Sequence, residues 1–374
     1  MSGDLRPLQR APLLALGFVG LVVGVAAGLA RLGYRVPEIA ASVSSLHGPL
    51  MIGGFFGVVI ALERAVAIGR YWAYLGPLLA GLGTVAIVAG AVPAAPWLLL
   101  GGSVVLLAAS LDVLRRQRAL FTLTLALGAA CWPIGNLLWA AGLAVHDVVA
   151  WWLAFLILTI AGERLELSRF LPPSPAARHA FVAILVVVFA GLVAARQPFG
   201  PRLLALGLLA LAAWLLKQDI ARRTVRKAGL TRFIAICLLS GYAWLAVGAI
   251  TMLAGSFVPG ARSYDAALHA LALGFVFSMV FGHAPVIFPA VLRVPVPYHW
   301  SFYVPLALLH GSLIVRLAGD AADRFEWTRV GGILNALALA AFIIGTASAV
   351  LRAASRRSPA QPSAPPPPGG AAPR

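Results

Sequence analysis

Twelve long apolar runs constrain the fold of this 374-residue chain more than any other feature. They fall at roughly 11–34, 47–66, 71–92, 95–114, 119–143, 148–166, 179–197, 201–217, 232–255, 266–292, 299–318 and 329–351. A helix of about 20 apolar residues crosses the hydrocarbon core of a bilayer. The sequence therefore predicts an all-α fold, a polytopic membrane helical bundle of about twelve transmembrane helices.

The composition excludes a soluble globular domain, because 61% of the residues are hydrophobic and only 11% are charged. The first run is long enough to span and many spans follow, so we interpret it as an uncleaved first helix rather than a signal peptide. We expect one transmembrane domain over residues 1–351. Residues 352–374 are rich in proline, alanine and glycine, which predicts a disordered tail.

The net charge of +17 comes from basic residues in the short segments between apolar runs. This placement indicates membrane topology and contact with the lipid bilayer rather than nucleic-acid binding. Alternate connections, including RRQR at 115–118 and ARRTVRKAGLTR at 221–232, carry most of the Lys and Arg residues. The positive-inside rule then places both termini in the cytoplasm, as expected for a multi-pass protein of a bacterial inner (cytoplasmic) membrane.

Polar residues that could do chemistry within the membrane are few. No Asp or Glu falls near the middle of a predicted span. A proton-driven transporter or redox pump usually needs such a carboxylate, so these classes are disfavoured. The only two cysteines, Cys131 and Cys237, exclude a CxxCH haem-attachment site and a cysteine-ligated cluster.

Two histidines lie at similar predicted depth, near the periplasmic ends of the second and tenth spans. These are His47 and His269, the latter four residues after Asp265. An intramembrane imidazole is costly unless it is hydrogen-bonded, metal-bound or hydrated. His47 and His269 are therefore candidate axial ligands of a haem. A structural histidine and a copper site are the alternatives.

His283 and His310 are further candidate cofactor ligands. His283 stands fourteen residues after His269, about 21 Å along a helix, so the two cannot bind one metal ion together. His310 falls near the middle of the eleventh span. Hydrogen bonding between helices is the alternative role for both.

Met51 is the third residue of a candidate metal site with His47 and His269. It follows His47 by four residues and therefore shares its helix face. Imidazole and thioether ligands together suit Cu(I), so copper is the alternative cofactor. Packing alone is the other explanation for a methionine here.

Two segments carry a family resemblance. HGPLMIGGFFGVVIALERAVAIG (47–69) resembles the second helix of haem–copper oxidase subunit I, in which a His-Gly pair followed by a methionine carries a haem ligand. The segment HALALGFVFSMVFGHAP (269–285), with the twelve-helix count, is similar to the same superfamily and more closely to NnrS-like proteins. The resemblance implies a haem–copper oxidase-like fold, with His47 and His269 as ligands of a b-type haem.

The resemblance also implies a role in nitric oxide metabolism, in denitrification, or in respiratory electron transfer, with NO or a redox protein as the partner. The histidines that bind copper in the oxidases have no counterparts in the sixth and seventh spans, so we expect no complete haem–copper dinuclear centre. The alternatives are a copper-handling or respiratory-enzyme assembly protein and a small-molecule transporter with structural histidines. The sequence leaves open whether the protein is an enzyme.

Overall fold

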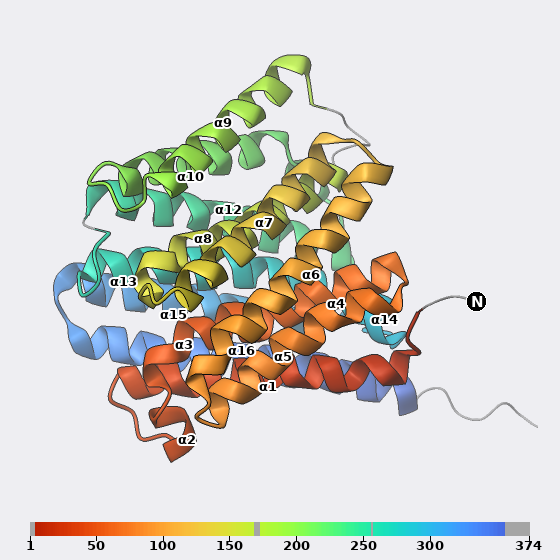
Figure 1. Ribbon diagram of the computed structural model, residues 1–374, viewed down its shortest axis with the longest axis horizontal. Coiled ribbons are helices and arrows are strands. Elements are labelled where there is room, and N and C mark those ends of the chain that lie inside the picture. Colours follow the sequence, from red (N-terminus) through yellow and green to blue (C-terminus); the bar gives the residue numbers. More distant parts are fainter. Residues whose placement is uncertain (1–3, 168–172, 256, 356–374) are drawn as a thin grey trace, which may run out of the picture.

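The protein is a bundle of helices in the computed structural model, which describes residues 4–167, 173–255 and 257–355. Every regular element in these residues is a helix. Within the described residues, twelve helical segments are long and apolar enough to cross a membrane, which confirms the predicted count. Figure 1 shows how these segments are arranged. The chain is therefore a multi-pass membrane protein. The tail predicted to be disordered from position 352 is helical at its start, because the last helix continues to Ser355, and the rest of it, 356–374, lies outside the described residues.

Ten of the twelve spans have one α-helix as their main element. These helices are α1 (Pro7–Arg31), α5 (Leu75–Val88), α6 (Ala95–Arg116), α7 (Leu120–Ala140), α8 (Val145–Leu167), α9 (Pro175–Val193), α10 (Gly200–Gln218), α12 (Gly229–Ala254), α15 (Tyr303–Ala322) and α16 (Phe325–Ser355). Short helical segments precede or connect them: α2 (Glu38–Ala41), η3 (Tyr71–Tyr74), η4 (Val92–Ala94), α11 (Ala221–Thr224) and η7 (Trp300–Phe302).

The second and tenth spans are composite. The second comprises η1 (Ser44–Leu46), α3 (His47–Pro49), η2 (Leu50–Phe56) and α4 (Gly57–Ile68). The tenth comprises α13 (Arg262–His269), η6 (Ala270–Phe277) and α14 (Ser278–Leu292). Both η2 and η6 are π-helical, with a wider turn than an α-helix. Hydropathy alone does not distinguish the two helix types, so the sequence predicted the spans but not these segments.

The helix ends follow local chemistry. Proline occupies the first turn of α6, α9 and α10, where its missing N–H removes no helical hydrogen bond. Ser174 caps α9 by accepting a hydrogen bond from the Ala177 amide. The tenth span begins at Arg262, four residues before the predicted position 266, because its first turn is polar. Apolar runs thus predict where a helix lies in the membrane better than where it ends.

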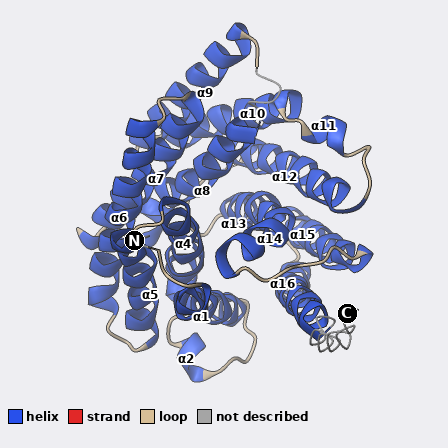
Figure 2. Cartoon of the chain, turned by 90° about the vertical axis from the view of Figure 1, so that its right-hand side faces the viewer, coloured by secondary structure: helices blue, strands red, loops and turns tan. Residues whose placement is uncertain are grey.

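Sequential spans pack as antiparallel neighbours, including α5 with α6, α7 with α8, α9 with α10, and α15 with α16. The composite spans occupy the interior, with α4 and α14 in contact near the centre of the bundle in end view (Figure 2). Each has an outer helix behind it, because η2 packs on α1 and η6 packs on α12. This arrangement brings the N-terminal parts of the second and tenth spans together.

Candidate functional site

The structure brings His47 and His269 together. Their ring centroids are 6.5 Å apart and their planes differ by 14°. No hydrogen bond joins the two rings, and neither Nε2 atom has a hydrogen-bond partner within the described residues. Two imidazoles from spans far apart in sequence therefore face one another across a gap.

The other ring nitrogen of each histidine is anchored to the backbone. His47 Nδ1 donates to the Gly24 carbonyl of α1 at 2.6 Å, and His269 Nδ1 donates to the Asp265 carbonyl at 2.8 Å. A histidine that binds a metal usually donates its second N–H in this way, which fixes the tautomer and the ring orientation. Both rings thus have the tautomer in which Nε2 carries a free lone pair.

The approach of His47 to α1 depends on a glycine. A Cβ atom at Gly28 would lie 2.9 Å from His47 Cε1 and 3.0 Å from Nδ1. Any larger residue at this position would displace the imidazole or the helix. Gly28 therefore permits the hydrogen bond to Gly24.

An ion pair supports His269 from the adjacent α15. Arg316 donates to Asp265 Oδ2 from Nη2 at 2.8 Å and from Nε at 3.1 Å. The other Asp265 oxygen lies 3.3 Å from His269 Nδ1. The Asp265 residue thus contacts the histidine through both its backbone and its carboxylate, and Arg316 holds that carboxylate in place.

The two histidines occupy equivalent positions relative to π-helical segments. Phe55 in η2 is eight residues after His47, and Phe277 in η6 is eight residues after His269. The two phenyl rings are stacked with centroids 6.0 Å apart and planes 4° apart. The second and tenth spans therefore meet with matching register, histidine opposite histidine and phenylalanine opposite phenylalanine. Segments of π-helix often occur at functional sites, and here one follows each histidine of the pair.

A cavity of about 550 Å³ includes both histidines in its wall. Much of its lining is apolar and includes Ile52, Phe56, Leu153, Leu156 and Phe277. Its wall also carries charged and polar side chains, among them Arg31, His146, Arg262, Asp265, Arg316, Asp320, Thr328 and Asn335. The cavity is therefore amphipathic, and its volume is in the range of pockets that hold cofactors and drug-sized ligands.

Two polar atoms in this wall have no hydrogen-bond partner among the described residues. They are Asp320 Oδ2 and Asn335 Nδ2, both buried. Buried polar groups are normally satisfied by protein, water or a ligand. Asp320 Oδ2 and Asn335 Nδ2 are exceptions to this rule among the described residues.

The comparisons with known proteins place the chain in a family. The model of a domain of unknown function, DUF8744, matches residues 10–351. The chain belongs to the DUF8744 family. No curated protein matches the chain, and no solved structure matches it. The DUF8744 match runs from the first span to the last and so includes every residue of the histidine pair and its cavity.

Met51, the third residue of the predicted copper set, lines the same cavity of this DUF8744 chain. Its sulfur packs toward α1, since a Cβ atom at Gly24 would lie only 2.8 Å from it. No group of three or more His, Cys, Asp and Glu side chains among the described residues has metal-binding geometry. The described part of the site thus has two facing imidazoles with a nearby thioether.

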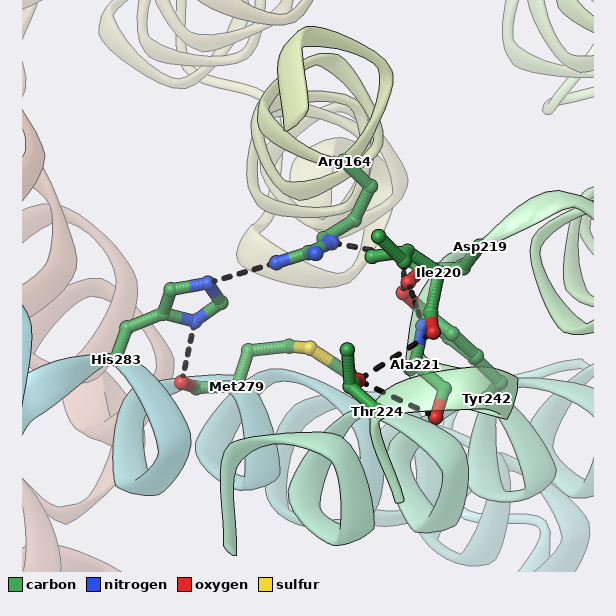
Figure 3. Close-up of polar contacts among 8 residues, drawn as sticks. All are labelled: Arg164, Asp219, Ile220, Ala221, Thr224, Tyr242, Met279 and His283. Carbon is green, nitrogen blue, oxygen red and sulfur yellow. Dashed lines mark hydrogen bonds and ion pairs between the residues drawn. The ribbon is translucent and has the colours of Figure 1, made fainter. Parts of the chain in front are cut away.

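His283, a further predicted ligand, lies in a separate polar cluster (Figure 3). Its Nδ1 donates to the Met279 carbonyl at 2.7 Å, and its Nε2 accepts from Arg164 Nη1 at 3.3 Å. Arg164 also donates to Asp219 Oδ2 at 2.8 Å, and the Tyr242 hydroxyl donates to the same oxygen at 2.6 Å. We name Arg164, Asp219, Tyr242 and His283 the arginine cluster. Both nitrogens of His283 are engaged in it.

His310, the remaining predicted ligand, also has both ring nitrogens engaged. Nδ1 accepts from Trp244 Nε1 at 2.9 Å, and Nε2 donates to Ser240 Oγ at 3.0 Å. These partners lie on α12, so His310 links α15 to α12. This is the hydrogen bonding between helices that we expected as the alternative role of His310.

Sequence reasoning missed Arg316 and Asn335. Arg316 interrupts the apolar run LIVRLAG in the eleventh span, and a lone charge inside a span is a recognised functional signal. Asn335 carried a weaker signal, a single amide in the twelfth span.

Proposed function

We propose that this protein is a bacterial inner-membrane haem protein in which His47 and His269 are the two axial ligands of one b-type haem. The observation that carries the proposal is the facing imidazole pair, with both Nδ1 atoms anchored and both Nε2 atoms free. The orientation expected from the basic connections places this pair toward the periplasmic side, with both termini in the cytoplasm.

The spacing of the rings fits one metal ion between them. Two metal–nitrogen bonds of about 2 Å, plus about 1 Å from each nitrogen to its ring centre, give centroids about 6 Å apart. The observed separation is 6.5 Å. An interplanar angle of 14° is compatible with two imidazoles that share one ion, provided that both Nε2 atoms point into the gap. A hydrogen-bonded pair of histidines would instead have its nitrogens in direct contact.

The cavity fits the remainder of the cofactor. A haem has an apolar macrocycle and two carboxylates at one edge, so it needs an amphipathic pocket. The apolar lining around Phe56 and Phe277 suits the macrocycle. Arg31, Arg262, Arg316 and Asn335 supply cationic and amide donors for carboxylates. Because the cavity has both an apolar and a cationic lining, it suits haem better than a bare metal ion.

Two histidine ligands favour respiratory electron transfer over gas binding. A bound haem supplies one-electron redox chemistry, and a six-coordinate iron has no open position for a small ligand. The chain's own residues would orient the imidazoles, bury the macrocycle and set the potential through Asp265 and Arg316. Nitric oxide handling is the other role that the family resemblance implies. It would require one of the two histidines to dissociate from the iron.

The test is a reduced-minus-oxidised visible spectrum of the detergent-purified protein, recorded also for His47→Ala and His269→Ala. We expect a Soret band and sharp α-bands in the wild type and their loss in each variant. His299→Ala, which changes an exposed histidine, is the matched control and should keep the spectrum. A folded but colourless wild type, purified from haem-sufficient cells, would overturn the haem assignment.

Copper is the second candidate, because Met51 lines the same cavity as the two histidines. Two imidazoles also bind Cu(I) in a linear arrangement, and a thioether stabilises that oxidation state. Metal analysis of the same preparation distinguishes the copper proposal from the haem proposal. One copper per chain without haem, lowered by Met51→Leu, would favour copper. Haem with a spectrum unchanged by Met51→Leu would favour the first proposal.

A further inference from the structure

An apolar groove separates α7 from α9 on the outside of the bundle. We name it the α7–α9 groove; its volume is about 660 Å³. It is lined by Leu120, Leu123, Leu127, Val182, Leu185, Val186, Phe189, Ala190 and Val193. Val186 is 63% exposed and Val193 is 78% exposed, so the groove is open to the surroundings.

The groove exists because its two helices pack on other partners. α7 packs on α6 and α8, while α9 packs on α10 (Figures 1 and 2). The α9–α10 pair lies at one edge of the bundle, where α9 flanks α7 without packing tightly on it (Figure 2). In a membrane the space between them must hold apolar material, since water there would have no polar partners in the lining.

Two arginines flank one end of the groove. Arg118 precedes Leu120 by two residues, and Arg178 precedes Val182 by four. α7 and α9 are the fifth and seventh spans and run in the same direction, so both arginines belong to the same end. Both are exposed, and neither forms an ion pair with another described residue. By contrast, the nearby Arg116 is paired with Asp112 at 2.6 Å.

We propose that the α7–α9 groove binds an anionic phospholipid, with an acyl chain along the groove and the phosphate between Arg118 and Arg178. The eleven-residue step from Val182 to Val193 corresponds to about 16 Å of helix. Half of a hydrocarbon core about 30 Å thick is about 15 Å, so the groove matches the acyl chain of one leaflet. The arginines then stand at headgroup depth, where basic side chains attract anionic lipids.

The lining argues against a second copy of the chain as the occupant. Helix interfaces in membranes are rich in small residues that allow close backbone approach. Ala190 is the sole small residue in the groove, and the others are Leu, Val or Phe. A flexible acyl chain fits an irregular bulky wall better than another helix does.

Native mass spectrometry of the full-length protein tests the proposal. The protein, purified in a mild detergent, is titrated with dioleoyl-phosphatidylglycerol or with dioleoyl-phosphatidylcholine. Two arginines at the headgroup should make the first phosphatidylglycerol bind roughly 5- to 30-fold more tightly than phosphatidylcholine. The double variant Arg118→Gln/Arg178→Gln should remove this preference, whereas Val186→Trp, which fills the groove, should weaken both lipids.

A matched control is Arg222→Gln/Arg223→Gln on α11, an exposed basic pair away from the groove. It should keep the preference for phosphatidylglycerol. Equal affinity for both lipids in the wild type, or equal losses in the two double variants, would overturn the proposal. A dimer in the wild type that Val186→Trp converts to a monomer would assign the groove to a second copy instead.

Discussion

The two halves of the tenth span each carry a histidine, and the surroundings of these two histidines differ. His269 has one nitrogen fixed by Asp265 and the other free at a cavity. His283 has one nitrogen fixed by Met279 and the other bonded to Arg164. The first arrangement leaves a lone pair for a ligand, and the second uses every polar atom for structure. The state of the second nitrogen separates a candidate metal ligand from a structural histidine.

The largest expected effect is on cofactor binding. Because His47 and His269 each supply an axial ligand, we expect His47→Ala and His269→Ala each to lower haem affinity more than the roughly 10–100-fold typical of outer-shell changes. His283→Ala should keep the full haem content. A pyridine haemochrome assay of haem per protein measures this. Equal haem loss in all three variants would remove the distinction between the two histidines.

The next largest effect is expected on stability, when the arginine cluster is disrupted. Arg164→Met leaves the buried Asp219 carboxylate without its cation, although Tyr242 still donates to it. Breaking a buried ion pair in this way costs about 3–5 kcal/mol. We expect a clearly lower thermal unfolding midpoint in detergent, with an unchanged haem spectrum below that midpoint. An unaltered midpoint would show that the cluster does not stabilise the fold.

Loss of the ion pair that supports His269 should have a moderate effect on haem binding. Arg316→Gln removes the charge that holds Asp265, and outer-shell changes of this kind typically cost about 10–100-fold in metal affinity. We expect weaker haem retention during dilution and a shifted midpoint potential in a spectroelectrochemical titration. Arg116→Gln, which alters an exposed arginine paired with Asp112 outside the cavity wall, is the control and should move neither quantity.

A smaller effect is expected at Gly28. Gly28→Ala places a methyl group 2.9 Å from the His47 ring, and crowding of this size typically costs about 1–3 kcal/mol. We expect a lower affinity for haem and an altered α-band. Gly311→Ala is the matched control, because nothing lies within 4 Å of a Cβ atom there. If both substitutions behave alike, contact with α1 does not position His47.

The smallest effect is expected at His310. His310→Leu removes hydrogen bonds to Trp244 and Ser240, and such bonds between membrane helices average about 0.6 kcal/mol. We expect a small drop in the unfolding midpoint and full haem content. Loss of haem in this variant would return His310 to the set of cofactor ligands.

The sequence by itself determined the twelve spans and the similar depth of His47 and His269. It could do so because each helix in lipid must satisfy its own backbone hydrogen bonds, which makes a span a local property of about 20 residues. Span ends varied by a few residues, because polar first turns extend a helix beyond its apolar run. The sequence also identified four histidines as candidate ligands, His47, His269, His283 and His310. It could not show which hydrogen-bond partners each of them has.

Only the tertiary structure decided which histidines meet. Gly24 and Asp265 anchor the His47–His269 pair, whereas Arg164 engages His283. These contacts join helices separated by many residues, and no local pattern of hydropathy records which faces pack together. The chemistry of an imidazole in this bundle is therefore set by its neighbours in space, while its depth is set by its place in the chain.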